Sequence, residues 1–318
     1  MPKIIFDTAI GSSNLGDHII MDAVHPILEE LFEDEFLLQI ATHQRIHPLD
    51  LPSLRSYDLA VVGGTNLLKN DNLRYSQWKV GPQEMLVLKN KVLLLGVGWW
   101  QYQKKPISGY SRALYKSLLS HRFQHSVRDQ YTKEKLASIG IRNVINTGCP
   151  TVWMLDEAHC AGIDTSRKKK VVTTITDYLR DPERDRQMLE ILQSNYEEVH
   201  LWLQGSQDLK YVQSLIGGLH YIAPKLSAFD RFLEEEDCDY VGTRLHAGIR
   251  ALQYKRRALI IGIDNRALEM RRDIGLPVLE RTQIHSLPQW IEQEAAIELK
   301  VDQSAIAAWK TQFTNQKA

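Results

Sequence analysis

The chain alternates short apolar runs with longer stretches in which apolar residues recur every three or four positions. The clearest stretch is residues 17–32, where Ile20, Val24, Ile27 and Leu31 follow this interval. Such spacing is typical of a helix with one buried face. The runs between these stretches are rich in Val, Ile and Leu, as in the strands of a parallel sheet. The alternation therefore predicts an α/β fold built from βαβ units.

The same pattern sets the expected order of elements. In the first half, strands are expected over residues 3–9, 36–41, 58–62, 91–97, 123–127 and 144–147, with helices over residues 17–32, 83–89, 109–120 and 130–139. In the second half, strands are expected over residues 171–175, 199–203, 220–222, 239–241, 258–263 and 277–279. Its helices are expected over residues 183–194, 209–215, 228–236, 245–253 and 266–273, and a last helical segment from Leu287 or Ser304 onward can pack on either domain.

A polar, basic stretch over residues 156–170 interrupts this rhythm and is the predicted linker. Its Arg167-Lys168-Lys169-Lys170 run is expected to be a solvated interdomain segment, with contact to an anionic lipid surface as the alternative. The linker divides the chain into two Rossmann-like domains, residues 1–160 and 161–318. Two such domains facing each other across a cleft form the GT-B-like arrangement of two-domain transferases, which is an analogy of fold alone.

Composition narrows the class of protein. The 318 residues are 43% apolar and 25% charged, which is typical of a soluble globular protein. Because 39 basic residues balance 39 acidic ones, the overall charge gives no reason to expect nucleic acid or an acidic membrane as a partner. No run of about 18 apolar residues occurs, so no transmembrane segment is expected. The predicted location is the cytoplasm, with a peripheral position at the inner face of the membrane as the alternative.

Cysteine and histidine usage gives no sign of a disulfide framework or a metal site. Cys149, Cys160 and Cys238 are far apart in sequence and form no Cys-x-x-Cys pair, so we expect reduced thiols. No His-Glu-x-x-His motif occurs, and His121 and His125 are expected at the start of a strand. We therefore predict that the protein needs no metal.

The most informative stretch runs from Asp239 to Gly248, where an apolar run stops and an arginine and a histidine follow. If Leu245 begins a helix, Arg244 and His246 lie at the carboxyl edge of a sheet, where open α/β folds bind ligands. A permanent cation beside a titratable imidazole indicates an anionic substrate.

Two glycine-containing segments follow predicted strands in the first half. The segment from Gly11 to Asp17 precedes the first long helix, and amide groups at a helix start attract anions. The alternative is that an Asn or Asp side chain caps the helix. The Gly63-Gly64 pair can form a nest of amide groups for an anion or a plain turn. Neither a Gly-x-Gly-x-x-Gly motif nor a Walker lysine is present.

Three further segments follow strands. Arg128 and Asp129 offer a guanidinium fork for a carboxylate or phosphate, or else pair with each other. Trp99-Trp100 can stack on a sugar face or lie in the core. The Gly148-Cys149-Pro150 segment is expected to shape a loop, and no basic residue adjoins Cys149 to activate its thiol.

In order along the chain, these motifs resemble the polysaccharide pyruvyl transferase family. The motifs are Asn14-x-Gly16-Asp17, Gly63-Gly64, Arg128-Asp129, Gly148-Cys149-Pro150 and Arg244-Leu245-His246. The resemblance extends from Asn14 to the strand that ends near Ile263, which is nearly all of the chain. It implies a GT-B-like fold and transfer of a pyruvyl group from phosphoenolpyruvate to sugar hydroxyls, with a ketal as product and phosphate released.

The resemblance also implies roles for individual residues. Phosphoenolpyruvate, the donor substrate, is expected to bind Arg128 and the Arg244-Leu245-His246 unit, with no cofactor required. Asn14, Gly16, Gly63 and Gly64 are expected at the substrate site. His246 is the candidate for protonation or for stabilising the phosphate, because imidazole titrates near neutral pH. Asp17, on the acceptor domain, is the candidate base for the sugar hydroxyl; the acceptor is a sugar or glycan, free or lipid-linked.

Two features depart from the family pattern, and two other functions stay open. Family members often carry a third glycine where Thr65 stands, and a small or Pro-containing turn in place of Trp99-Trp100. One alternative is a GT-B glycosyltransferase with a nucleotide-sugar donor. Retaining enzymes of that kind carry a spaced pair of glutamates, but here Glu190 and Glu198 lie ahead of the expected site. The other alternative is a non-catalytic sugar-binding protein.

Overall fold

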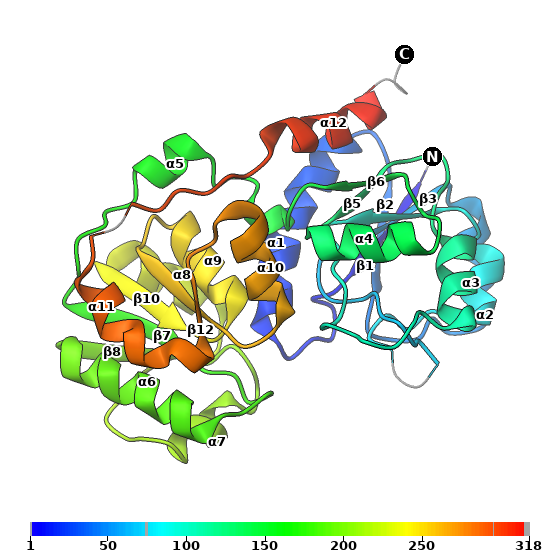
Figure 1. Cartoon of the computed structure of the whole chain (residues 1–318). Helices are drawn as coiled ribbons and strands as arrows, with labels where there is room; N and C mark the ends of the chain where they lie inside the picture. The colour runs from blue at the N-terminus through cyan, green and yellow to red at the C-terminus, as the bar shows by residue number, and fades with distance from the viewer. Residues whose placement is uncertain (1, 74–75, 295, 315–318) are drawn as a thin grey trace. The chain divides into compact units, whose positions relative to one another are not determined.

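The computed structural model describes residues 2–73, 76–294 and 296–314, and they form two compact units. Unit 1 comprises Met1–Ser12, Ile20–Trp153 and Val301–Ala318, and unit 2 comprises Ser13–Ile19 and Met154–Lys300. Each unit is a parallel sheet with helices packed around it (Figure 1). The α/β prediction is confirmed.

Unit 1 contains a four-stranded parallel sheet in the order β2-β1-β3-β4, extended by the short pair β5-β6. Its strands are β1 (Lys3–Asp7), β2 (Leu37–Ala41), β3 (Leu59–Gly63), β4 (Val92–Leu95), β5 (His125–Val127) and β6 (Val144–Asn146). Its helices are α2 (Pro82–Val87), α3 (Gly109–Leu118), α4 (Gln130–Ser138), α12 (Gln303–Thr314) and most of α1 (Leu15–Leu31), with short 3-10 turns at Leu51–Ser56 and Pro150–Val152.

The last helix, α12, belongs to the core of unit 1. Trp309 is fully buried and its ring meets that of Trp153 in a T-shaped contact, with ring centroids 5.8 Å apart. Phe313 makes a similar contact with Phe32 at 5.4 Å. Burial of such large aromatic rings is strongly stabilising, which is why the final segment packs on the first half of the chain.

Unit 2 is a six-stranded parallel sheet in the order β12-β11-β10-β7-β8-β9. Its strands are β7 (Lys170–Thr174), β8 (Glu198–Trp202), β9 (His220–Ile222), β10 (Cys238–Gly242), β11 (Ala258–Gly262) and β12 (Val278–Glu280). Its helices are α5 (Glu157–Ala161), α6 (Pro182–Asn195), α7 (Asp208–Gln213), α8 (Leu226–Glu235), α9 (Leu245–Gln253), α10 (Asn265–Ile274) and α11 (Leu287–Glu292), with a 3-10 turn at Arg281–Ser286. The chain winds one way from β7 to β9 and the other way from β10 to β12, so a topological switch point lies between β7 and β10.

Every strand and helix expected from the sequence is present, with ends shifted by a few residues. The predicted linker over residues 156–170 contains the short helix α5, capped by Asp156, whose side chain accepts a hydrogen bond from the His159 amide. Both candidates for the last helical segment exist, as α11 and α12. None of the helices in the described ranges is long and apolar enough to cross a bilayer.

The compact units differ from the predicted ranges 1–160 and 161–318 in two main places. Residues 13–19 pack with unit 2, because the Leu15 amide donates to the Gln204 carbonyl at 2.9 Å and Asn14 bridges to Gly205. Residues 301–314 pack with unit 1 through α12. The first of these places the start of α1 among the strand ends of unit 2.

Candidate active site

The ends of β7 and β10 approach closely at the switch point of unit 2. A side chain at Gly242 would place its Cβ 2.5 Å from Thr174 Oγ1 and 2.7 Å from the Thr174 amide nitrogen, so only glycine fits there. Beyond it, the Thr243 amide donates to the Thr174 carbonyl at 2.8 Å. The Thr243 hydroxyl accepts from the Thr176 amide at 2.9 Å. The two strand exits are therefore held side by side.

The backbone of Arg244 is fixed on both sides. Its amide donates to Thr174 Oγ1 at 3.3 Å, and its carbonyl accepts from the Tyr240 hydroxyl at 2.9 Å. One turn later, α9 packs closely on β11, because a Cβ at Gly248 would lie 2.4 Å from Ile260 Cγ1. The start of α9 is thus set at the carboxyl edge of the sheet, as the sequence predicts.

The Arg244 guanidinium is buried, with 4% of the residue exposed, and only one side of it is paired. Its Nη2 donates to Asp208 Oδ1 and, at 3.4 Å, to Asp177 Oδ1. The Tyr178 ring lies over it, with its centroid 5.1 Å from Cζ. Its Nε has no hydrogen-bond partner among the described residues. A buried N–H group without an acceptor is costly, so this atom is a candidate donor to a ligand.

Asp208 joins three strand exits. It begins α7, is fully buried, and accepts from the amides of Gly205 at 2.7 Å and Asp177 at 3.1 Å as well as from Arg244. Burial raises the pKa of Asp208 above its ordinary value, and the Arg244 guanidinium and the amides offset this only in part.

Asn14 and Gly16 attach the start of α1 to this edge. The Asn14 side chain caps α1 by accepting from the Gly16 amide at 3.1 Å, and it also accepts from Gln204 Nε2 at 2.9 Å. A Cβ at Gly16 would lie 2.7 Å from the same Gln204 nitrogen. Both residues therefore have a structural role in the loop, which is the capping alternative left open by the sequence.

Asp17, Leu245 and His246 are in the same unit as Arg244. Asp17 lies in the first turn of α1, is 8% exposed, and accepts from Asn14 Nδ2 at 3.4 Å. His246 lies in the first turn of α9 and is 5% exposed. The prediction had placed Asp17 on the acceptor domain; by packing it belongs to unit 2. The catalytic roles of Asp17 and His246 stay predictions.

A second arginine near the site was missed by the sequence analysis. Arg266, in the first turn of α10, donates to the Tyr178 hydroxyl, and its Cζ lies 5.7 Å from the ring centroid of that tyrosine. Asp264 orients it by accepting from Nε at 2.9 Å. Tyr178 is therefore flanked by two guanidinium groups. Nothing local in the sequence distinguished Arg266 from an ordinary helix-capping neighbour of Asp264.

Arg128 lies in unit 1 and is packed in its interior, with 1% of the residue exposed. Its Nε and Nη2 donate to Asp129 Oδ2 at 3.0 and 2.8 Å, and its Nη1 donates to Asn66 Oδ1 at 2.6 Å. Gly98 packs against it, since a Cβ there would lie 2.3 Å from the guanidinium carbon. The pairing with Asp129, which the sequence left open, is present. Contact between Arg128 and phosphoenolpyruvate stays a prediction.

The Gly63-Gly64 pair allows α1 to pack closely on the end of β3. A Cβ at Gly64 would lie 2.2 Å from Ile20 Cγ2, and one at Gly63 would lie 3.0 Å from Val24 Cγ1. Gly64 and Thr65 have φ of +59° and +55°. The left-handed conformation at position 65 gives a physical reason for the third glycine often found there in the family. Substrate contact by the pair stays a prediction.

Replacing Thr65 with glycine is expected to stabilise unit 1 by about 0.5 kcal/mol. The relief of left-handed strain at a branched residue, about 1–2 kcal/mol, exceeds the extra entropy that glycine loses on folding, about 0.5–1 kcal/mol. Urea unfolding measures the change. Thr65→Ala keeps the positive φ penalty and serves as the control. A Thr65→Gly protein less stable than the wild type contradicts this explanation of the position.

The two tryptophans have different environments. Trp99 is fully buried and donates through its indole nitrogen to Asn70 Oδ1 at 3.0 Å, so it belongs to the core. Trp100 is partly exposed, and Lys69 Nζ lies 4.9 Å from its ring centroid. Burial lowers the pKa of Lys69. Of the pair, only Trp100 can offer a face to a sugar.

The cysteines are buried and unpaired with one another, as expected for reduced thiols. Burial raises the pKa of Cys149, and raises that of Cys238 to about 12, so neither is a ready nucleophile. Burial likewise lowers the pKa of His125 to about 4; this neutral imidazole accepts from the Leu94 amide at 3.2 Å. Across the described ranges, no three His, Cys, Asp or Glu side chains gather in a way that could hold a metal ion.

Unit 1 has a carboxylate–imidazole pair that the sequence analysis also missed. Asp7 ends β1, is 2% exposed, and lies 2.9 Å from His25 Nε2 through Oδ2. Burial opposes ionisation of Asp7, but the hydrogen bond with His25 and the Ala9 amide outweigh it and lower the Asp7 pKa. The same hydrogen bond, against the effect of burial, raises the His25 pKa.

This pair is expected to stabilise the fold within a window of pH. The His25 contribution is complete below the ordinary value of 6.5 and is lost as pH rises through the raised pKa. The Asp7 contribution is complete above 3.8 and is lost as pH falls through the lowered pKa. The free energy of unfolding that His25→Gln loses relative to the wild type should therefore be larger at about pH 5 than at about pH 9. An equal loss of stability at both pH values, or the same pH trend in the exposed control His121→Gln, contradicts the pairing.

Solved structures with a similar fold come from sugar-nucleotide enzymes. UDP-GlcNAc 2-epimerase from Methanocaldococcus jannaschii superposes with a TM-score of 0.58 at 10% identity, covering 99% of each chain. S. aureus MnaA in its UDP co-structure superposes with a TM-score of 0.56 at 13% identity, covering 99% of this chain and 97% of that one. A putative UDP-N-acetylglucosamine 2-epimerase from Listeria monocytogenes superposes with a TM-score of 0.53 at 13% identity, covering 98% of this chain and 96% of that one. At such identities the likeness shows the fold, which is GT-B-like as predicted.

Sequence comparison is more specific about the family. No curated protein matches the chain significantly. A family model described as polysaccharide pyruvyl transferase matches residues 14–265, a range that begins at the Asn14 cap and takes in Arg244 and His246. The match covers most of the chain and confirms the resemblance noted in its motifs. The chain therefore belongs to the polysaccharide pyruvyl transferase family.

Proposed function

We propose that this protein transfers the pyruvyl group of phosphoenolpyruvate to hydroxyls of a sugar acceptor, forming a ketal and releasing phosphate, in polysaccharide or glycoconjugate biosynthesis. The observation that carries the proposal is the buried Arg244 guanidinium, whose Nε has no acceptor among the described residues, at the start of α9. Family membership supports an enzyme that acts on a glycan.

The donor carries a carboxylate and a phosphate, and the strand exits of unit 2 offer groups for both. Arg244 presents Nε, and the first amides of α9 lie outside the intrahelical hydrogen-bond pattern at the positive end of the helix. Arg266 lies on the other side of Tyr178 and adds a second guanidinium. Two separately mounted arginines suit an anion with two charged ends.

The chemistry needs two proton movements and one leaving group. A proton is added to the methylene carbon, so that the central carbon gains positive character and is attacked by a sugar hydroxyl. Phosphate then leaves, and a second hydroxyl attacks the same carbon to close the ketal. The two hydroxyl protons balance the one placed on the methyl group and the one that leaves on phosphate. Charge that develops on phosphate is stabilised by fixed cations.

We assign His246 to proton delivery or phosphate stabilisation and Asp17 to deprotonation of the sugar hydroxyl. Imidazole titrates near neutral pH, which suits a group that gives and regains a proton. Both residues are largely buried and lie in the first turns of helices in unit 2. Arg128, Gly63 and Gly64, which lie in unit 1, stay predicted substrate-binding residues.

Calorimetric titration of the purified chain with phosphoenolpyruvate and, separately, with UDP tests the proposal. Saturable binding of phosphoenolpyruvate, displaced by inorganic phosphate, is the expected result. UDP binding alone would favour a nucleotide-sugar glycosyltransferase, in keeping with the solved structures of similar fold, and binding of neither would favour a sugar-binding protein. Phosphate release with a panel of sugar acceptors then tests turnover: full rates in His246→Gln or in Asp17→Asn would contradict the role given to that residue.

A further inference from the structure

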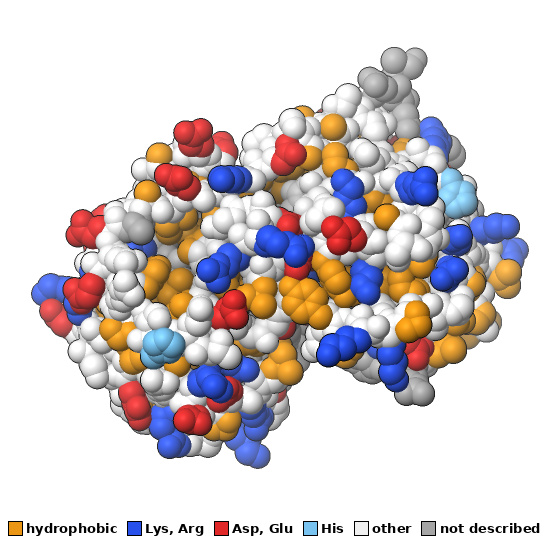
Figure 2. All heavy atoms as spheres, viewed as in Figure 1, with side chains coloured by type: hydrophobic (Ala, Val, Ile, Leu, Met, Phe, Trp, Pro, Cys, Tyr) orange, Lys and Arg blue, Asp and Glu red, His pale blue; other side chains and the backbone are white. Residues whose placement is uncertain are grey.

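The balanced total charge of the chain hides a strong local imbalance. Residues 42–153, all in unit 1, contain 16 Lys and Arg but only 6 Asp and Glu, although the whole chain has 39 of each. The remainder of the chain therefore carries the opposite excess. Figure 2 shows the result on the face turned to the viewer, where Lys and Arg dominate the half that carries α3 and α4 while both signs are mixed over unit 2.

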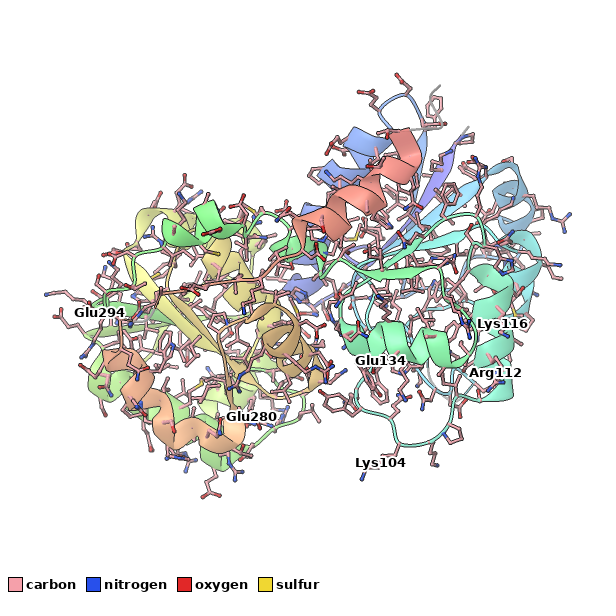
Figure 3. All side chains as sticks on the ribbon, turned by 45° about the horizontal axis from the view of Figure 1, so that its top comes forward. Lys104, Arg112, Lys116, Glu134, Glu280 and Glu294 are labelled. Carbon is pink, nitrogen blue, oxygen red and sulfur yellow. The ribbon has the colours of Figure 1, made fainter. Side chains whose placement is uncertain are left out.

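Four exposed cations form the centre of this region, and we call them the basic face: Lys104, Lys105, Arg112 and Lys116. The first two lie in the loop before α3. The other two lie one turn apart on α3, so their side chains share one side of the helix. Figure 3 shows Lys104, Arg112 and Lys116 pointing outward from unit 1.

The basic face is not neutralised within unit 1. No described Asp or Glu forms an ion pair with any of its four members, and the exposed acid nearby is Glu134 on α4. The neighbouring helix adds Lys135, whose Nζ donates to the Gln103 carbonyl at 3.3 Å and so ties α4 to the same loop. Like charges held together repel, and an external layer of negative charge relieves that repulsion.

An exposed aromatic ring lies beside these cations. Tyr102 is 52% exposed, directly precedes the Gln103-Lys104-Lys105 run, and packs edge-on against Tyr131 with ring centroids 5.2 Å apart. A tyrosine presents an apolar body and a polar tip, which suits the boundary between lipid headgroups and acyl chains. Cations with an adjacent exposed aromatic ring match an anionic bilayer, whose headgroups attract the cations and whose interface accommodates the ring.

We propose that the basic face binds the surface of a lipid bilayer that contains anionic headgroups, with Tyr102 at headgroup level. The attraction is electrostatic and local, so it needs no net charge on the whole chain. It also needs no spanning helix, because the protein lies on the membrane surface. Such docking would hold unit 1 near an acceptor sugar carried on a lipid.

Co-sedimentation with vesicles tests the proposal directly. The wild-type chain is expected to bind vesicles of phosphatidylcholine with phosphatidylglycerol, to bind pure phosphatidylcholine weakly, and to dissociate as salt is raised. Reversing the basic face (Lys104→Glu, Lys105→Glu, Arg112→Glu, Lys116→Glu) should lower the partition coefficient on the order of 100-fold. The matched control reverses four exposed cations of unit 2, Lys210→Glu, Lys225→Glu, Arg231→Glu and Lys300→Glu, and should lower it far less.

A second variant separates the ring from the charges. Tyr102→Ser changes no charge and should lower binding several-fold while leaving its dependence on phosphatidylglycerol intact. Equal binding to vesicles with and without phosphatidylglycerol would overturn the proposal, as would an equal loss in the control variant. Binding to the soluble polyanion hyaluronate with none to vesicles would assign the basic face to a glycan instead.

Discussion

Replacing Arg244 with alanine is expected to weaken phosphoenolpyruvate binding at least about 100-fold and to remove pyruvyl transfer, because the buried charged donor proposed to bind the anion is lost. The side chain is 4% exposed, and the backbone of Arg244 is held by Thr174 and Tyr240, so the guanidinium is kept in one place. Calorimetric titration and phosphate release measure the two effects. Arg244→Lys keeps the charge but loses Nε and should recover only part of the affinity.

A matched control for this substitution lies on the same helix. Arg250 is on α9 and pairs with Asp230, with its Nε 2.8 Å from Oδ1. Arg250→Ala removes a guanidinium of equal size away from the strand exits and should leave the donor affinity within about twofold. Thermal unfolding of both proteins checks that they remain folded. Donor affinity unchanged in a folded Arg244→Ala protein would remove the basis for the proposed site.

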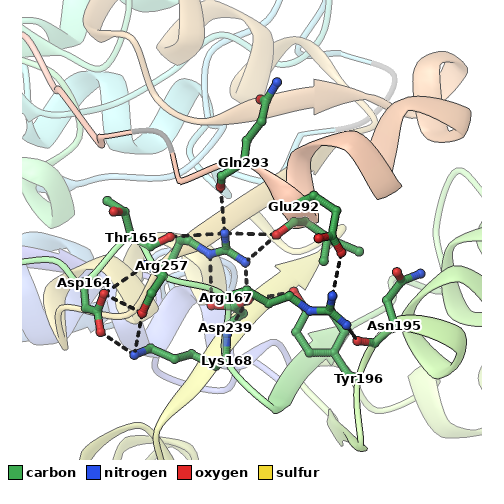
Figure 4. A network of polar contacts seen from close by, with 12 residues as sticks. Asp164, Thr165, Arg167, Lys168, Asn195, Tyr196, Asp239, Arg257, Glu292 and Gln293 are labelled. Carbon is green, nitrogen blue, oxygen red and sulfur yellow. Dashed lines mark hydrogen bonds and ion pairs between the residues drawn. The ribbon is translucent and has the colours of Figure 1, made fainter.

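Replacing Arg257 with methionine is expected to destabilise unit 2 by about 3–5 kcal/mol, because it leaves a buried carboxylate without its partner. Arg257 is 2% exposed and Asp239 is fully buried. The guanidinium holds that carboxylate through Nε at 3.1 Å and Nη2 at 2.5 Å (Figure 4). Its Nη1 donates to the carbonyls of Thr165 at 3.3 Å and Gln293 at 2.9 Å, and so fixes the linker and the segment after α11.

The same network contains an exposed ion pair that serves as a control, because its loss is expected to cost little stability. Arg167 also pairs with a carboxylate, Glu292, but their side chains are 39% and 62% exposed. Arg167→Met should therefore cost less than about 1 kcal/mol. Replacing both buried partners, Arg257→Met with Asp239→Leu, should recover part of the loss. Urea unfolding measures the change in stability of all three proteins, and hydrogen exchange in β10 measures it locally. Equal losses for Arg257→Met and Arg167→Met would contradict the role of burial.

The fold could be predicted from the sequence because its signals are local. The three- and four-residue repeat in α1 and the Val- and Ile-rich run of β10 each follow from residues adjacent in the chain. Arg244 and His246 were found for the same reason, since a strand end and a helix start bracket them. The packing of α12 on unit 1 was left open, because it depends on contacts between Trp309 and Trp153 that are distant in sequence.

The partners of Arg244 could not be predicted, because they come from other strand exits. Asp208 follows β8 and Tyr178 follows β7, and neither is marked by a local motif. Only the strand order β10-β7-β8 brings them to Arg244. Arg128 is the reverse case. Its neighbour Asp129 is local and visible, but whether the two side chains pair or face a ligand depends on Asn66 and Gly98, which lie elsewhere in the chain.

The basic face was missed for a different reason. Its residues are plain in the sequence, but a count over the whole chain averages them against the acidic remainder. Counting residues 42–153 by themselves reveals it, and the structure shows which of these cations are exposed on and beside α3. Net charge indicates a binding partner only when it is summed over the surface that contacts the partner, and not over the whole chain.

The central claim is that the anionic donor binds at the strand exits of unit 2. A crystal structure with phosphoenolpyruvate bound tests it most directly. We predict donor density within hydrogen-bonding distance of Arg244 Nε and of the first amides of α9, with Arg266 and Tyr178 beside it. Donor bound elsewhere, with Arg244 Nε still lacking an acceptor, would contradict the claim.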